Sequence, residues 1–329
     1  MQTLPVRLAV LAFLGALLTT AASGRADPPP AVSLSFVPHW VPQAQFAGFY
    51  VGYEHGFYAE HGIDLTILTG GPDHPSSEML ASGTADVATL WLSTALRERA
   101  HGTPIVHVAQ LVQRSSLVLV ALRASGITAP RDLDGKKVSV WQGDFLLQPQ
   151  AFFKENGLDV RMVPQGSSIN LFLRGGVDAA TAMWYNEYHT ILDAGVDPDE
   201  LTTFFFYDRG LNFPEDGIYC REPLATSPAC GAFAEASLAG WRYAFAHPEE
   251  ALDVVMKYIA AAHLPANRVH QRWMLARMHD AIAPAGDPVP LGTLRREDFD
   301  RVAGVLMESG AITSLPDFAA FHPTLPAQP

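Results

Sequence analysis

The apolar and polar positions of the chain form a short α/β unit near the N-terminal end. Val32 to Phe36 alternates apolar and polar residues as a strand does. A helical pattern over Ala47 to Glu60 follows, and Gly62 separates it from a second strand, Ile63 to Leu68, which ends at Gly70-Gly71-Pro72. The order of helix, glycine and strand predicts an α/β fold.

The same unit occurs a second time. A helical pattern runs from Leu147 to Asn156, Gly157 ends it, and Leu158 to Val163 is the next predicted strand. Further on, Gly175 to Thr181 repeats Gly83 to Thr89, with an aspartate at the fourth position of each segment. A repeat of this length is too long for a solenoid unit and predicts two similar α/β lobes that face each other.

Two segments are expected to join the lobes. The strand Ser116 to Leu122 crosses to the second lobe and Asp216 to Arg221 returns, with the ligand cleft between the lobes. We therefore divide the chain into residues 31–118 for the first part of lobe 1, 119–215 for lobe 2 and 216–329 for the rest of lobe 1. This last part is mostly helical, with one helix pattern ending at His247 and another starting at Pro248.

Residues 1–26 have the pattern of a signal peptide. Arg7 precedes the apolar run Leu8 to Leu18, and the small residues Thr19 to Ala26 allow cleavage before Asp27. The run is too short for a membrane-spanning helix, and no cysteine lies near the cleavage site to carry a lipid anchor. We expect an exported, soluble periplasmic protein.

Composition narrows the function further. The formal net charge of −12 disfavours a nucleic-acid partner, and 48% hydrophobic residues are enough for compact lobes. The two cysteines, Cys220 and Cys230, lie close in sequence and are expected to form a disulfide in an oxidising compartment. We expect a monomer.

Aromatic and polar residues gather at or just after the predicted strand ends. The aromatic ones are Trp40, Phe46, Trp91, Trp141, Trp184 and Tyr185. The polar ones are Gln43, Ser93, Gln113, Gln142, Asp144, Asn186 and Glu187. Because rings stack on planar heterocycles, and Arg114 is the nearest evident cation, this set favours a heterocycle with ring nitrogens over nitrate, sulfonate or phosphate. Core packing of the rings and surface placement of the carboxylates are the alternatives.

From this set we choose the candidate ligand-binding residues. Trp40, Phe46 and Trp91 are the expected wall from lobe 1, and Trp141 and Tyr185 the wall from lobe 2. The expected polar partners are Gln43, Ser93, Gln113, Asp144, Asn186 and Glu187, of which the last two fix the ligand's orientation.

Motifs for metal or catalytic chemistry are missing from the sequence. The twelve histidines include no His-Glu-x-x-His motif, and His55 and His61 are six residues apart, off one helical face. The chain also lacks a nucleophile elbow, a phosphate-binding glycine loop and a dinucleotide fingerprint. We therefore expect no catalytic residue, no metal and no cofactor.

Several segments resemble the thiamine-pyrimidine-synthase-like family, which includes SsuA-like and thiamine-precursor periplasmic substrate-binding proteins. They are Trp40 to Tyr50, Gly56 to Gly62, Gly70 to Pro72, Met183 to Tyr188, Glu215 to Gly217 and Gln271 to Met274. The resemblance implies the type II periplasmic-binding fold and a solute-binding subunit that serves ABC permease and ATPase partners. It also implies a thiamine pyrimidine precursor as ligand, with riboflavin as an alternative.

Two other functions stay open within this resemblance. The family's eukaryotic synthases consume a histidine of their own chain and use lysine-bound pyridoxal phosphate and iron near a cysteine-rich motif. Here Phe46 stands where that histidine is expected, and a cysteine-rich cluster is missing, so the resemblance implies the fold and the ligand class rather than the enzyme. A sensory module that presents its lobes to a receptor is the second alternative.

Overall fold

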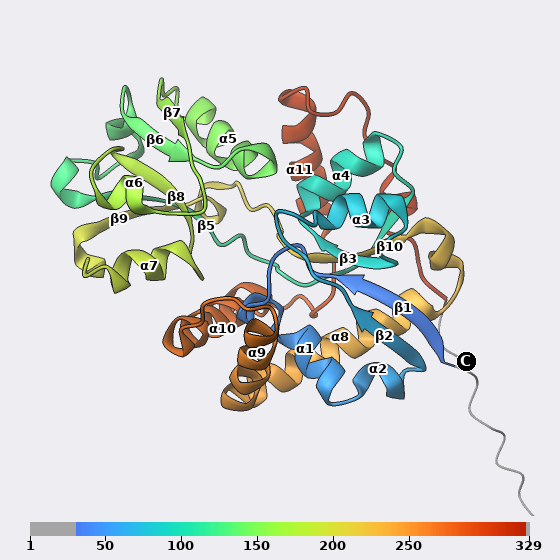
Figure 1. Ribbon diagram of the computed structural model, residues 1–329. Coiled ribbons are helices and arrows are strands. Elements are labelled where there is room, and N and C mark those ends of the chain that lie inside the picture. Colours follow the sequence, from blue (N-terminus) through green and yellow to red (C-terminus); the bar gives the residue numbers. More distant parts are fainter. Residues whose placement is uncertain (1–30, 327–329) are drawn as a thin grey trace, which may run out of the picture. The chain divides into compact units, whose positions relative to one another are not determined.

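The computed structural model describes residues 31–326 (Figure 1). The predicted signal peptide, residues 1–26, lies outside the described residues. Among the helices of the described part, none is long and apolar enough to cross a membrane.

The first sheet has five strands in the order β2-β1-β3-β10-β4. β1 runs parallel to β2 and β3, whereas β10 runs antiparallel to both β3 and β4. Its strands are β1 (Val32–Val37), β2 (Ile63–Ile67), β3 (Val87–Leu90), β4 (Ile105–Gln110) and β10 (Gly217–Arg221). The predicted strands at the start of the chain are thereby confirmed.

The second sheet repeats this plan in the order β7-β6-β8-β5-β9. β6 runs parallel to β7 and β8, and β5 runs antiparallel to β8 and β9. Its strands are β5 (Leu117–Leu122), β6 (Lys137–Val140), β7 (Arg161–Pro164), β8 (Ala179–Met183) and β9 (Leu201–Phe205). β7 begins at Arg161, later than the predicted start at Leu158.

Each sheet contains one strand that directly follows the other sheet along the chain. β5 takes the position in the second sheet that β10 takes in the first, although each follows a strand of the other sheet in the chain. The chain therefore passes between the sheets twice, after β4 and after β9. The division into lobes at residues 118/119 and 215/216 stays a proposal, based on these two passages.

The repeated aspartates have the same structural role in both sheets. Asp86 Oδ2 accepts the backbone N–H of Ser35 in β1 at 3.0 Å, and Asp178 Oδ2 accepts that of Lys137 in β6 at 2.8 Å. Each aspartate stands just before the central strand that pairs with β1 or β6. The repeated aspartates therefore attach β3 to β1 and β8 to β6 through the same hydrogen bond.

Twelve α-helices lie within the described residues. They are α1 (Ala47–Glu54), α2 (Phe57–Glu60), α3 (Ser76–Ser82), α4 (Leu92–Ala100), α5 (Leu147–Glu155), α6 (Asn170–Leu173), α7 (Glu187–Asp193), α8 (Ala229–Ala246), α9 (Pro248–Ala261), α10 (Arg268–Ile282), α11 (Arg296–Glu308) and α12 (Phe318–Phe321). The predicted single helix from Ala47 to Glu60 is wrong, because Gly56 adopts the left-handed conformation with φ +75° and ends α1. Pro248 begins α9 as predicted.

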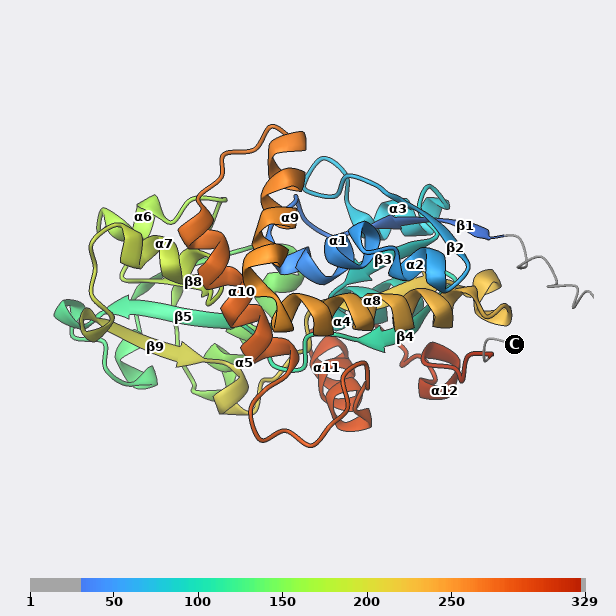
Figure 2. The ribbon, with the colours of Figure 1, turned by 90° about the horizontal axis from the view of Figure 1, so that it is seen from below.

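Close packing of α1 on α8 builds the core beneath the first sheet. A Cβ on Gly240 would lie 2.1 Å from the Gly48 carbonyl oxygen, and one on Gly48 would lie 2.3 Å from the Trp241 ring. Phe36 of β1 packs on Phe49 of α1 in the same core, with the ring centroids 4.5 Å apart and the rings tilted by 31°. Figure 2 shows α8 leading into α9 and α10, and α10 contacts both α9 and α7.

The predicted disulfide is present. Cys220 in β10 is bonded to Cys230 at the start of α8, and their Cα atoms are 6.5 Å apart. Both residues are buried. The bond therefore ties the first turn of α8 to β10, an inner strand of the first sheet.

Candidate functional site

A cavity of about 510 Å³ lies where the carboxyl ends of β1, β6, β7 and β8 meet. Loops after strands of both sheets contribute side chains to it, as expected for ligand sites of open α/β sheets. The lining residues are His39, Trp40, Gln43, Gln45, Pro72, Trp141, Phe145, Gln165, Gly166, Ser167, Met183, Tyr185, Asn186 and Glu187.

Aromatic rings form much of the wall. The Trp141 ring is anchored by its Nε1–H, which donates to the Gly166 carbonyl at 3.0 Å. Phe145 lies between two tryptophans, with ring centroids 5.7 Å from Trp141 and 4.4 Å from Trp91. Tyr185 is 4% exposed and lines the cavity from the end of β8. A wall of fixed rings is suited to stacking on a flat ligand.

A buried carboxylate organises the polar side of the cavity. Asp216 Oδ1 lies 2.6 Å from His39 Nδ1, and its Oδ2 accepts from Gln45 Nε2 at 2.8 Å. Gln43 Nε2 then donates to Gln45 Oε1 at 2.5 Å. Because Asp216 is itself 2% exposed and lies just before β10, it fixes the positions of His39 and both glutamines.

A second carboxyl group stands at the opposite side, where α7 begins. Glu187 Oε2 accepts the backbone N–H of Met183, and Oε1 accepts from Asn186 Nδ2, both at 2.9 Å. Burial raises the pKa of Glu187 to about 7, although the hydrogen bonds from Met183 and Asn186 act in the opposite direction and lower it. Asn186 Oδ1 lies 2.8 Å from His270 Nε2, so its amide holds Glu187 in place. The Glu187 oxygens keep further lone pairs for a ligand N–H group.

The structure brings six of the predicted site residues to the cavity: Trp40, Gln43, Trp141, Tyr185, Asn186 and Glu187. The other five lie outside its lining: Phe46, Trp91, Ser93, Gln113 and Asp144. Phe46 and Ser93 are core residues, and Trp91 packs behind Phe145. Gln113 donates to the Gln110 and Thr293 carbonyls.

Asp144 lies outside the cavity lining and makes its contacts with α4. Its side chain accepts hydrogen bonds from Thr94 and Arg97 of α4. Asp144 follows β6 of the second sheet, whereas α4 follows β3 of the first. The carboxylate therefore links the two halves of the described structure.

The charge of the lining limits the kind of ligand. Among the described residues that line the cavity, none is a lysine or arginine. A sulfonate or phosphate would find no lysine or arginine in this lining, whereas the amide and carboxyl groups can pair with N–H groups and ring nitrogens of a ligand. A second cavity of about 510 Å³ lies between α5 and α11, and its described lining contains no aromatic ring.

Sequence reasoning missed several lining residues, chiefly His39, Gln45 and Phe145. Each stands within a few residues of a predicted aromatic, so the strand-end rule located their loops but not their side chains. It also missed His189, Asp193 and His270, which lie close enough together to hold a metal ion.

Comparison with known protein sequences gives a consistent picture. The profile of a family described as "NMT1/THI5 like" matches residues 43–251. The chain is 26% identical over 241 residues to the formylaminopyrimidine-binding protein of Halalkalibacterium halodurans, covering 69% of this chain and 70% of that protein. It is 28% identical over 154 residues to the 4-amino-5-hydroxymethyl-2-methylpyrimidine phosphate synthase THI12 of Saccharomyces cerevisiae. That alignment spans 44% of each chain, less than half the synthase.

Among solved structures, the chain is similar to the periplasmic aliphatic sulphonate binding protein SsuA from Escherichia coli. The TM-score is 0.68 at 17% identity, and the match covers 90% of this chain and 94% of SsuA. At this identity the likeness shows the fold alone. It confirms the predicted fold class, two α/β sheets in the arrangement of a periplasmic binding protein.

Proposed function

Because the chain belongs to the NMT1/THI5-like family, we propose that it is the solute-binding protein of an ABC importer and that it captures a planar nitrogen heterocycle. A thiamine pyrimidine precursor, a formylaminopyrimidine or a hydroxymethylpyrimidine, is the first candidate ligand, and riboflavin is the second. The observation that carries this proposal is the cavity at the strand ends, with aromatic walls, the Glu187 carboxyl group and no lysine or arginine in its described lining. The buried Asp216 holds His39 and Gln45 of this lining from behind.

The cavity chemistry matches an aminopyrimidine in three respects. Trp141 and Phe145 offer faces for stacking, which contributes about 0.5 to 1.5 kcal/mol per pair beyond burial. Glu187 offers carboxyl oxygens to an exocyclic amino group. Gln43, positioned through Gln45, faces the cavity from the first sheet and can pair with a ring nitrogen or a formyl oxygen.

Catalysis of pyrimidine synthesis is the competing function, and the residues present do not fit it. Pyridoxal phosphate would need a lysine in the cavity, and none is among its described lining residues. A cysteine-rich iron site also does not fit, because the chain has two cysteines and Cys220 is bonded to Cys230. Phe46 stands where the resemblance places the consumed histidine, and it is fully buried. We therefore propose binding without chemistry.

The remaining parts of the proposal concern the cell. We propose export to the periplasm without a lipid anchor, a monomeric state, and ABC permease and ATPase subunits as partners. The periplasmic-binding fold supports the periplasmic location and the ABC partners. The alternative is a sensory receptor as partner in place of the permease. If the partner is a receptor, deletion of the gene for this protein leaves import of the heterocycle unchanged, and if it is a permease, import is lost.

A pair of tryptophan variants tests the site. Trp141 and Trp184 are both partly buried and both follow a strand end, but only Trp141 lines the cavity. We expect Trp141→Ala to weaken binding of formylaminopyrimidine by roughly 5- to 150-fold, or about 1 to 3 kcal/mol. Trp184→Ala should leave the dissociation constant within about twofold.

Calorimetric titration of the purified wild-type protein and both variants gives the result. If a ligand binds the wild type and Trp141→Ala with the same affinity, this cavity is not the binding site of that ligand. Equal losses in both variants would show a general effect of losing a tryptophan.

A further inference from the structure

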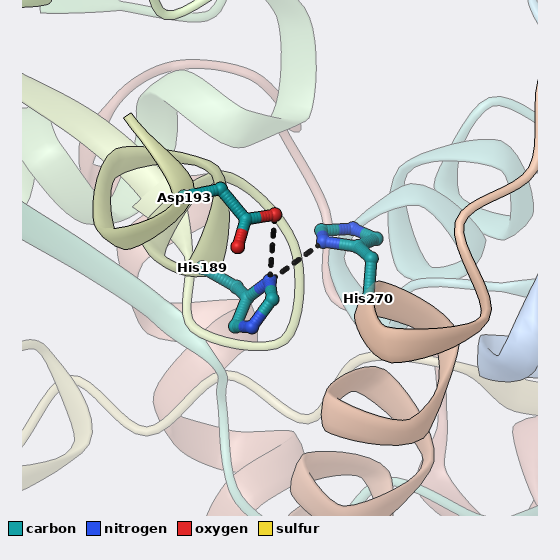
Figure 3. A group of neighbouring side chains, drawn as sticks. All are labelled: His189, Asp193 and His270. Atoms are coloured by element: carbon teal, nitrogen blue, oxygen red, sulfur yellow. Dashed lines mark hydrogen bonds and ion pairs between the residues drawn. The ribbon is translucent and has the colours of Figure 1, made fainter. Parts of the chain in front are cut away.

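Three side chains outside the cavity wall converge beside it. His189 and Asp193 stand one turn apart on α7, and His270 faces them from the first turn of α10 (Figure 3). His189 Nδ1 lies 3.0 Å from His270 Nδ1 and 3.3 Å from Asp193 Oδ2. One ligand atom from each residue lies within 4.8 Å of the others. In residues 31–326 no other group of at least three histidine, cysteine or acidic side chains meets this condition.

These separations match those around a small divalent ion. In a tetrahedral site with metal–nitrogen distances of about 2.0 to 2.1 Å, two ligand atoms lie about 3.3 to 3.4 Å apart. The observed 3.0 and 3.3 Å from His189 to its two partners are close to that value, and the ligand atoms of Asp193 and His270 lie within 4.8 Å of each other. Two imidazoles and one carboxylate are also a donor set that zinc and other late first-row metals accept.

The surrounding hydrogen bonds orient His270 as a ligand. Asn186 Nδ2 donates to Glu187, which identifies Asn186 Oδ1 as the acceptor of the 2.8 Å bond with His270 Nε2. The ring proton of neutral His270 is therefore on Nε2, and the Nδ1 lone pair points toward His189 and Asp193. Histidines that bind metals commonly donate their second ring N–H to such an oxygen.

In this group two acceptors face one ring nitrogen. His270 Nδ1 and the Asp193 carboxylate are both acceptors, and His189 Nδ1 is the single group between them. One N–H on His189 cannot satisfy both fully, whereas a cation accepts lone pairs from all three. His189 is buried, His270 is half-buried and Asp193 is exposed, so an ion can enter from the Asp193 side.

We propose that His189, Asp193 and His270 form a binding site for one divalent transition-metal ion, with zinc as its test ligand. The ion joins α7, which follows β8 of the second sheet, to α10. Water or an external ligand completes its coordination. Because Asn186 contacts His270 and also lines the cavity, the metal site is continuous with the cavity wall.

The test uses full-length protein without a histidine tag, stripped of metal with a chelator. Calorimetric titration with zinc chloride should give one ion per chain. Cobalt(II) should give the visible absorption of a tetrahedral or five-coordinate ion. Asp193→Asn and His270→Ala should each raise the zinc dissociation constant at least about tenfold, while Asp193→His, which restores a ligand atom, should keep zinc bound. Circular dichroism checks that each variant is folded.

A second histidine pair supplies the matched control. His107 Nδ1 and His322 Nδ1 are also 3.0 Å apart, but this pair belongs to no three-residue group in the described part of the chain. His322→Ala should therefore leave zinc binding unchanged. Unchanged binding in Asp193→Asn and His270→Ala, a loss in His322→Ala alone, or no zinc binding by the wild type at about 100 μM would each overturn the proposal. Zinc and heterocycle are titrated separately, so either result stands without the other.

Discussion

Removal of the disulfide is a perturbation whose size follows from the structure. Cys220 and Cys230 are ten residues apart, and their bond closes a short loop between β10 and α8. In the chain-entropy account, cross-linking a loop of this length destabilises the unfolded chain by about 2.7 kcal/mol. The reduced wild-type protein should therefore have a lower free energy of unfolding by about that amount.

Packing contributes separately when the sulfur atoms are also removed. Both cysteines are at most 1% exposed. Replacing both by alanine removes two buried sulfur atoms, each comparable to a buried methylene group and equivalent to about 1 kcal/mol. We expect the double variant Cys220→Ala/Cys230→Ala to be roughly 4 to 5 kcal/mol less stable than the oxidised wild type.

Urea unfolding followed by tryptophan fluorescence separates the two contributions. The wild type is measured with and without reductant, and the double variant serves as the control for effects of the reductant elsewhere. The wild type should lose about 2.7 kcal/mol on reduction, and the double variant should not respond. A loss below about 0.5 kcal/mol in the wild type, or an equal response of the double variant, refutes the reasoning.

Two further predictions concern the carboxyl groups of Glu215 and Asp144. Burial, with the neighbouring Asp216, raises the pKa of Glu215 from 4.5 to about 8, and Tyr185 is the other titratable group that faces it. The folded state therefore holds a proton that the unfolded state releases, so stability falls between pH 4.5 and 8 by up to about 1.4 kcal/mol per pH unit. Glu215→Gln should reduce the fall in melting temperature between pH 5 and 8, and parallel profiles of wild type and variant would contradict this. For the link between Asp144 and Arg97, a double-mutant cycle with alanine should give a coupling energy of about 1 to 3 kcal/mol in unfolding, whereas additive effects would remove the link.

Much of the fold could be predicted because its signals are local. In strands such as β1 and β2, apolar residues alternate with polar ones or follow one another over a few positions. The repeated aspartates mark the start of β3 and β8. The break at Gly56 was missed because a glycine within a helical pattern does not reveal its φ angle. The start of β7 was placed too early because an apolar run does not show which residues pair with β6.

The site could be predicted only as far as its loops. Trp141 and Tyr185 follow strand ends and line the cavity. Trp91 and Phe46 also follow predicted strand ends, but they are buried outside the cavity lining. Periodicity gives the strand ends, whereas the direction of each side chain depends on contacts from distant segments. The proposed metal site illustrates this limit, because His270 is 81 residues from His189 and no spacing rule joins them.

The central claim, capture of a planar nitrogen heterocycle in the cavity at the strand ends, is tested most directly by calorimetric titration of the purified protein. Formylaminopyrimidine, hydroxymethylpyrimidine, riboflavin and an aliphatic sulfonate are titrated in turn. We predict saturable binding of one heterocycle at one site per chain and no heat from the sulfonate. Binding of the sulfonate with none of the heterocycles would contradict the account, because the described cavity lining offers no lysine or arginine to hold it.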